Sequence, residues 1–481
     1  MSVLRTTGGE RAPRIRTKPH NFFVRSAAMV ILTLAFGVVS ASNPVIGQSL
    51  TAVFVLSLLF LISGGIALVF PFADRLHPLR LVSGLFLLTY CVAPQFLFRI
   101  TWYFRGEVGG LLLDAAATAL LALVSIAIGF WMAGMAAARP APVSPSPRAH
   151  LAIGSGASLA LISVAGAAYA LLFVFAGGLE RMLGGDESRV QFFRGFGALY
   201  HASFFVFPGA ALWLTRATVQ AGRFYWTSAL PLLMALAGFM LLQGRLRALT
   251  AAVALTIAYH YLVRAIPRAW LLAAGALSLV AFLFVGYARD PEVRFLVLSR
   301  PWDVILSFAA SAQKFATSNF GEPFNRLLQA MLVLDNVGDR IPYRWGATFL
   351  QVFDPFLRLI GQPFQRPPGV ILFRLAQPGM GSLETGYHPS LVGEVLMNFP
   401  RLIAPIFFAA YGAIVQRIYS RLIVSHPDFL SVATYSVALL PLLSMVVVGV
   451  GQLLFELALV TAPLLALRVI IPRPSHASAR G

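Results

Sequence analysis

The chain of 481 residues contains little of what crosslinks or charges a soluble protein. Its single cysteine, Cys91, lies inside an apolar run, which excludes intrachain disulfides and thiolate metal sites. Only 11% of the residues are charged, whereas 58% are hydrophobic and the mean hydropathy is +0.79. Apolar stretches of 18 or more residues recur along the sequence, and each is long enough to cross a hydrocarbon core of about 30 Å. These features indicate a membrane protein with many spans.

Lysine is almost absent too. All 37 basic residues except Lys18 and Lys314 are arginine, and the formal net charge is +19. A GC-rich genome explains this preference for arginine as well as any function does. The basic residues are spread over loops along the whole chain, and no basic patch interleaved with aromatic residues occurs. Nucleic acid is therefore not an expected partner.

The pattern of apolar runs predicts an all-α polytopic fold with about twelve transmembrane helices. The first run follows a basic segment without a small-residue cleavage site, so it is expected to be a retained helix rather than a signal peptide. The predicted helices span residues 26–43, 50–70, 81–98, 111–137, 151–177, 197–214, 224–242, 247–263, 269–287, 400–417, 429–448 and 452–470.

Arginine positions predict the orientation of these helices. The tail 1–25 carries six basic residues, which places it in the cytoplasm by the positive-inside rule. Helices one to nine then occupy 26–287 and helices ten to twelve occupy 400–470, so the short tail 471–481 is also cytoplasmic. The segment 288–399 becomes one large, partly helical extracytoplasmic loop, rich in Trp, Tyr, Phe and Pro. Loops longer than about 15 residues are usually functional or disordered, and this aromatic composition argues against disorder.

Ionisable residues inside the predicted helices favour the outer half of the membrane. Asp114, His201 and Glu456 lie there in this orientation, and intramembrane acids and histidines mostly face a bundle interior or a cavity. The turn "QGRLR", which holds Arg245 and Arg247, is also outside, where the positive-inside rule would not place it. His260, near an inner helix end, is interpreted as an interfacial residue without a chemical role.

Three stretches of the sequence are similar to a known family of membrane enzymes. They are "LLQGRLRALTAAVALTIAYHYLVR", "IPYRWGATFLQVFDPFL" and "GYHPSLVGEVLMNFPRLIAPIFFAAYGAIVQRIY". Together they resemble the bacterial oligosaccharide repeat-unit polymerases, the Wzy-type O-antigen polymerases, which are related to the O-antigen ligases. One departure is Pro400, because the family pattern has glycine after the preceding "NF".

This resemblance implies a GT-C-like fold and an activity in the bacterial cytoplasmic membrane. Members join repeat units linked to undecaprenyl pyrophosphate on the outer face of that membrane, giving O-antigen, capsule or another exopolysaccharide. Its implied partners are the lipid-linked oligosaccharide, membrane lipid, a chain-length regulator and a flippase. An O-antigen ligase is the nearest alternative. A transporter or flippase for lipid-linked sugars and an assembly subunit are alternatives from other classes.

Glycosyl transfer of this kind requires stabilisation of a departing pyrophosphate. The first outer loop, "SNPVIG", has no acid, and "DES" at 186–188 is only a weak paired acidic site, so no metal site and no cofactor are expected. Arginines are the natural alternative, because their planar donors fit phosphate oxygens. The pyrophosphate-binding candidates are Arg245, Arg247, Arg189, Arg194 and Arg344. For each of them, snorkelling or an ion pair is the structural alternative.

The remaining candidates come from the long loop. A carboxylate or imidazole there could act as the base for the acceptor hydroxyl, and aromatic rings could stack on sugars. The catalytic candidates are Glu394, Glu384 and His388, and the sugar-binding candidates are Tyr343, Trp345 and Tyr387. Alternatively, Glu394 caps the tenth helix and His388 forms a hydrogen bond within a proline turn.

Overall fold

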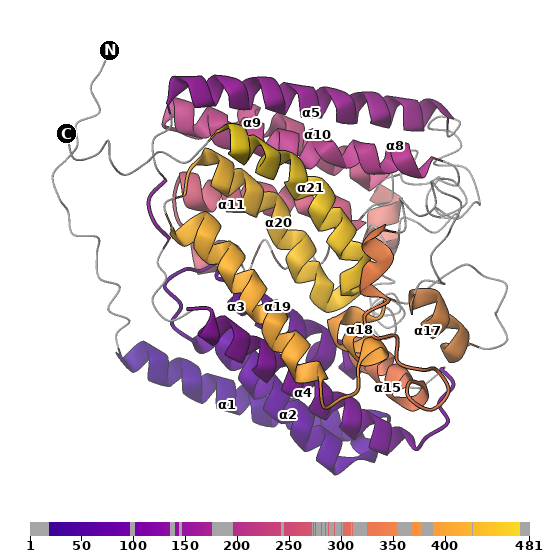
Figure 1. Cartoon of the computed structure of the whole chain (residues 1–481). Coiled ribbons are helices and arrows are strands. Elements are labelled where there is room, and N and C mark those ends of the chain that lie inside the picture. Colours follow the sequence, from indigo (N-terminus) through magenta and orange to yellow (C-terminus); the bar gives the residue numbers. More distant parts are fainter. Residues whose placement is uncertain are drawn as a thin grey trace.

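The computed structural model contains only helices and their connections among the residues it describes, apart from one isolated bridge between Val337 and Ile341 (Figure 1). These residues are 19–96, 102–134, 140–143, 147–175, 196–241, 245–271, 325–353, 368–377, 388–425 and 427–471, with scattered positions between 272 and 324. The predicted all-α fold is therefore confirmed for these residues.

The N-terminal part forms four helices, and the second and third of them begin at a side-chain cap. Ser49 accepts a hydrogen bond from the backbone N–H of Ala52, and the His77 ring accepts one from Leu79, so each side chain satisfies a free donor of a first turn. The helices are α1 (Pro19–Ser42), α2 (Leu50–Gly64) with a π-helical end (Gly65–Val69), α3 (Pro78–Phe86) and α4 (Val108–Met132).

The middle part forms α5 (Arg148–Phe175), α8 (Gly197–Ala202), α9 (Val206–Ala221), α10 (Trp226–Leu241) and α11 (Arg245–Leu262). The segment predicted as a long loop contributes α15 (Arg326–Asn336), α17 (Pro368–Ala376) and α18 (Ser390–Asn398), with a 3-10 turn at Phe349–Phe353. The chain ends with α19 (Ala404–Tyr419), α20 (Phe429–Val448) and α21 (Val450–Ile470).

Helices occupy each predicted transmembrane range except 269–287, which lies largely outside the described residues. Among the described residues, eight helices are long and apolar enough to cross a membrane, and α10 and α11 are shorter apolar helices. α19 has only 16 residues. A count of about twelve spans therefore stays a prediction.

Helix α20 lies at the centre of the bundle, and most of its residues are buried. Tyr435 belongs to a core shared with α2, α3, α4, α15, α18 and α19, whereas Ala433 belongs to a core shared with α5, α8, α9, α10, α11 and α21. In Figure 1 these two halves lie below and above α20. Within the first half, Gly129 of α4 and Gly412 of α19 let two backbones touch, since a Cβ at either would collide with the other helix.

The antiparallel course of the helices creates two polar ends. One end collects the connection 70–77, the end of α11 with residues 263–268, and the junction between α19 and α20; we call it the Asp74 end. The opposite end collects α8, the start of α11, the turn 343–348, α18 and the start of α21; we call it the Glu394 end. α18 and α15 mark the Glu394 end on the right of Figure 1.

Candidate functional site

Glu394, the first catalytic candidate, caps a helix, but not the one expected. Its carboxylate accepts hydrogen bonds from the backbone N–H groups of Val450 and Gly451, which are the first two residues of α21 rather than part of α19. Thr348 donates a third hydrogen bond at 2.7 Å. Burial raises the pKa of the Glu394 carboxyl, and these three donors offset the rise only in part, so the net pKa is raised. With both oxygens occupied, the geometry favours a structural role.

Gly449 makes this cap possible. Its φ of +112° is open to glycine alone at little cost, and a Cβ there would lie 2.6 Å from Glu394 Oε2. The helix N-terminus carries a partial positive charge, which a carboxylate stabilises. The short break between α20 and α21 is therefore tied to α18 by one buried acid.

Trp345 lies beside this cap on a strained turn. The side chain of Asn398 accepts hydrogen bonds from the N–H groups of Gly346 and Thr348, and its backbone carbonyl accepts the N–H of Trp345 at 3.0 Å. The turn holds Trp345 at φ +48°, a region that non-glycine residues rarely adopt. Its indole is 65% exposed and packs edge-on against Tyr343. Strain of this kind tends to occur at functional sites.

Arg247, Glu456 and His201 form the second group at this end. Arg247 of α11 makes an ion pair with Glu456, which follows the α21 cap by six residues, or about 9 Å along the helix. The guanidinium also lies over the Phe204 ring, 5.6 Å from its centroid. His201 packs against Phe455 at 4.9 Å between ring centroids. Arg247 Nε and His201 Nδ1 are buried atoms with no hydrogen-bond partner among the described residues.

Arg326, a buried cation that the sequence analysis did not single out, lies in the segment predicted as a long loop. Arg326 is 3% exposed and donates hydrogen bonds to Gln329 at 2.6 Å and to the carbonyl of His388 at 3.1 Å. Burial lowers the pKa of Arg326 to about 10. The N-cap residue Asn325, just before it, is the sequence signal for the start of this helix.

The other predicted site residues divide into two sets. Arg344 and Tyr343 are half-buried beside the Trp345 turn, whereas the side chain of His388 is exposed. The rest lie outside the described residues: Arg189, Arg194, Glu384, Tyr387 and the side chain of Arg245. Of the three groups predicted to lie inside the membrane, His201 and Glu456 come together, but Asp114 pairs with Arg401 at 3.0 Å on a half-exposed surface.

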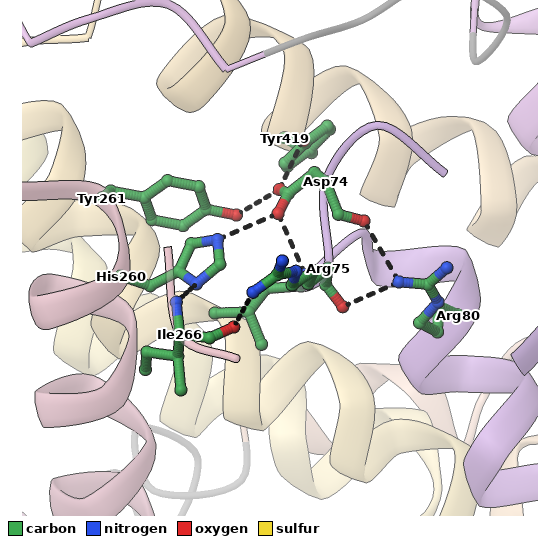
Figure 2. Close-up of polar contacts among 8 residues, drawn as sticks. Asp74, Arg75, Arg80, His260, Tyr261, Ile266 and Tyr419 are labelled. Carbon is green, nitrogen blue, oxygen red and sulfur yellow. Dashed lines mark hydrogen bonds and ion pairs between the residues drawn. The ribbon is translucent and has the colours of Figure 1, made fainter. Parts of the chain in front are cut away.

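The Asp74 end holds a network that the sequence reading missed (Figure 2). The Asp74 carboxylate accepts hydrogen bonds from the hydroxyls of Tyr261 and Tyr419, each at 2.6 Å, and from the backbone N–H of Leu76 at 2.9 Å. His260 lies 3.2 Å away through Nε2. The partners are up to 345 positions apart in sequence. No local pattern could therefore have revealed the network.

The same network fixes the protonation of His260. The backbone N–H of Ile266 donates to Nδ1 at 3.1 Å, so that nitrogen is unprotonated and Nε2 carries the proton that points at Asp74. Burial raises the pKa of the Asp74 carboxyl, but hydrogen bonds from His260, Tyr261 and Tyr419 outweigh it and the net pKa is lowered. His260 is therefore part of a buried hydrogen-bond network, the Asp74 network, and not the interfacial residue expected.

Among the described residues, no group of three His, Cys, Asp or Glu side chains is arranged to hold a metal ion. Comparison of the chain with protein-family models, curated proteins and solved structures finds no significant match. The functional argument therefore rests on the geometry of the two ends.

Proposed function

We propose that this chain is a membrane glycosyltransferase that polymerises oligosaccharide repeat units linked to undecaprenyl pyrophosphate, at the Glu394 end. In the predicted orientation this end faces away from the cytoplasm, in the bacterial cytoplasmic membrane. The product is a surface polysaccharide such as O-antigen, capsule or exopolysaccharide. The transfer is metal-independent.

Arg247 is the observation that carries the proposal. Its Glu456 partner takes up one Nη, while the buried Nε–H has no acceptor among the described residues. A buried unpaired donor is costly unless a ligand supplies the acceptor. A pyrophosphate oxygen would satisfy it and would place charge where the leaving group develops it.

The other groups at this end complete the site. His201 Nδ1 is a neighbouring ring nitrogen with no hydrogen-bond partner among the described residues, and in the tautomer that leaves it unprotonated the imidazole takes the role of base that the geometry denies to Glu394. The exposed Trp345 and the adjacent Tyr343 offer apolar faces for sugar rings. These features all contact the first two turns of α21, through the Glu394 cap, Phe455 or Glu456.

The test uses purified protein in lipid nanodiscs with a lipid-linked oligosaccharide, and the readout is a ladder of polymer lengths. Arg247→Gln should lower the rate by about 10²- to 10³-fold, the range for loss of a donor that stabilises developing charge. Glu456→Gln combined with Arg247→Gln removes the ion pair without leaving a lone charge. This double variant should regain thermal stability but not activity. The wild-type protein should remain active in EDTA.

The matched control is the ion pair at the other end of α21. Arg468 donates to both carboxylate oxygens of Asp428 and to Ser431. Arg468→Gln with Asp428→Asn should change the melting temperature comparably and leave the polymer ladder intact. Full activity in the Arg247/Glu456 double variant would reject the site, and the absence of any polymer from the wild type would reject the function.

The same assay separates the alternatives. A ligase would transfer glycan to a lipid A–core acceptor and would not extend a second lipid-linked unit. A flippase would move the lipid-linked oligosaccharide across the bilayer of a proteoliposome without forming a new glycosidic bond. Supplying each acceptor in turn to the same preparation therefore assigns the class.

A further inference from the structure

Four arginines gather at the Asp74 end from four separate segments. Arg25 lies in the second turn of α1, Arg75 in the connection 70–77 and Arg80 in the first turn of α3, and Arg268 is the first helical residue after the connection that follows α11. Arg25 belongs to this end because Met29, one turn further along α1, lies where a Cβ of Gly64 would be.

Hydrogen bonds hold two of these arginines in place. Arg75 donates to the carbonyl of Ile266 at 2.7 Å, which brings it beside the segment that continues to Arg268 (Figure 2). Arg80 donates to the carbonyl of Phe70 at 2.9 Å and to those of Asp74 and Arg75 at 3.5 and 3.4 Å. These contacts use backbone carbonyls, so they fix the guanidinium positions without neutralising their charge.

Acidic side chains do not balance this cluster within the described part of the chain. None of the four arginines forms an ion pair there. The Asp74 carboxylate is directed toward the hydroxyls of Tyr261 and Tyr419, and Arg80 forms a hydrogen bond only with the backbone carbonyl of Asp74. Burial lowers the pKa of Arg268, and the positive charges of Arg25 and Arg75 lower it further. The cluster is therefore a concentrated positive charge without an ion pair of its own among the described residues, and the nearby Asp74 carboxylate offsets it only in part, at Arg80.

The cluster lies where lipid headgroups would be. The membrane-spanning stretches Phe22–Ser42 and Pro78–Phe96 both begin within a few residues of it. Exposed aromatic side chains flank it, with Trp270 70% and Phe70 44% exposed, as is typical of the membrane interface. Basic pockets between helices at this depth bind anionic headgroups, because guanidinium donors fit phosphate oxygens.

We propose that Arg25, Arg75, Arg80 and Arg268 form a binding site for the phosphate headgroup of an anionic lipid from the leaflet at the Asp74 end. The site is separate from the glycosyl-transfer site and does not depend on the proposed function. Its ligand is a phosphatidylglycerol or cardiolipin headgroup, bound by guanidiniums from three helix ends and one connection.

Delipidated protein in neutral detergent, titrated with cardiolipin and followed by native mass spectrometry, tests the proposal. Removing two arginine–headgroup contacts by Arg25→Gln/Arg268→Gln should weaken cardiolipin binding about 30-fold, at about 1 kcal/mol per charge. Arg25→Lys/Arg268→Lys keeps the charge and should retain part of the affinity. Both residues are at least partly exposed, and neither side chain forms a hydrogen bond or ion pair with another described residue, so the fold should persist.

The matched control removes two arginines elsewhere at the same end, Arg223→Gln/Arg417→Gln, both of which are exposed. It should leave cardiolipin affinity within about threefold, since only diffuse attraction is lost. Equal weakening by the two double variants would overturn the proposal in favour of general surface charge. If inorganic phosphate displaces cardiolipin when both supply the same concentration of phosphate groups, the proposal would be overturned in favour of a site for free phosphate.

Discussion

Asp74 and Glu394 are two buried acids at opposite ends of the same bundle, and they are satisfied in different ways. Asp74 accepts from side chains on α11 and α19, so it links elements that are distant in sequence. Glu394 accepts mainly from backbone N–H groups at the start of α21. The net pKa is lowered at Asp74 and raised at Glu394. Side-chain donors from several helices thus stabilise the charged form of Asp74 more strongly than the donors around Glu394 do.

The ion pairs on α21 extend the contrast. At the Asp74 end, Arg468 bonds to both Asp428 oxygens and to Ser431. At the Glu394 end, Arg247 Nε and the nearby His201 Nδ1 have no hydrogen-bond partner within the described part of the chain. A saturated pair fits a structural role, whereas an unsaturated one fits ligand binding. This difference is why we place the chemistry at the Glu394 end.

The largest effect is expected from Asp74→Asn. The amide replaces one acceptor oxygen with donors that face two tyrosine hydroxyls and the His260 N–H, so the free energy of unfolding should fall by about 3 kcal/mol. A lower melting temperature in detergent micelles measures this loss. Asp114→Asn is the control, because its pair with Arg401 is half-exposed and should contribute at most about 1 kcal/mol. Equal losses of stability in the two variants would show that the buried Asp74 network contributes no more than the half-exposed Asp114–Arg401 pair.

Glu394→Gln should have an intermediate effect on stability. The amide keeps one acceptor for the α21 cap but turns donors toward the N–H groups of Val450 and Gly451, at a cost of about 1–3 kcal/mol. If Glu394 only caps the helix, the folded variant should polymerise at a rate close to the wild type. If the variant folds but is inactive, Glu394 rather than His201 would be the candidate for the catalytic base.

The pH dependence of stability should have opposite signs at the two ends. The folded pKa of Asp428 is lowered, since Arg468 outweighs burial; its contribution is present above the unfolded pKa of about 3.9 and is lost as the pH falls below it. The folded pKa of Glu394 is raised, so its contribution is present below about pH 4.3 and is lost as the pH rises through the folded value.

Melting temperatures between pH 3 and pH 7 test these signs against variants that do not titrate. The advantage of the wild type over Asp428→Asn should shrink as the pH falls below about 4. Its advantage over Glu394→Gln should instead shrink as the pH rises. If both melting-temperature differences changed in the same direction with pH, the environments of the two acids would not differ as described.

The smallest effect on stability is expected from Trp345→Gly. The variant removes an exposed ring and relieves the positive φ, so the melting temperature should change little or rise. If the indole stacks on a sugar, KM for the lipid-linked substrate should rise about tenfold, equivalent to about 1.4 kcal/mol. An unchanged KM would remove Trp345 from the sugar-binding surface.

The sequence predicted the helices well because their signal is local. An apolar run of about 20 residues marks a span wherever it occurs, and α20 matches its predicted range of 429–448. The candidate site was predicted only in part. Arg247, Glu456 and His201 were each recognised as unusual, but the sequence could not show that they meet, since Arg247 and Glu456 are 209 positions apart.

The sequence by itself therefore determined the class of the protein, the positions of most helices and the concentration of unusual charge near certain turns. Only the tertiary structure decided which charges are satisfied. Arg468 and Arg247 look alike in sequence, and so do Asp74 and Asp114. Their difference comes from the donors and acceptors that packing brings beside each one, and packing joins residues hundreds of positions apart.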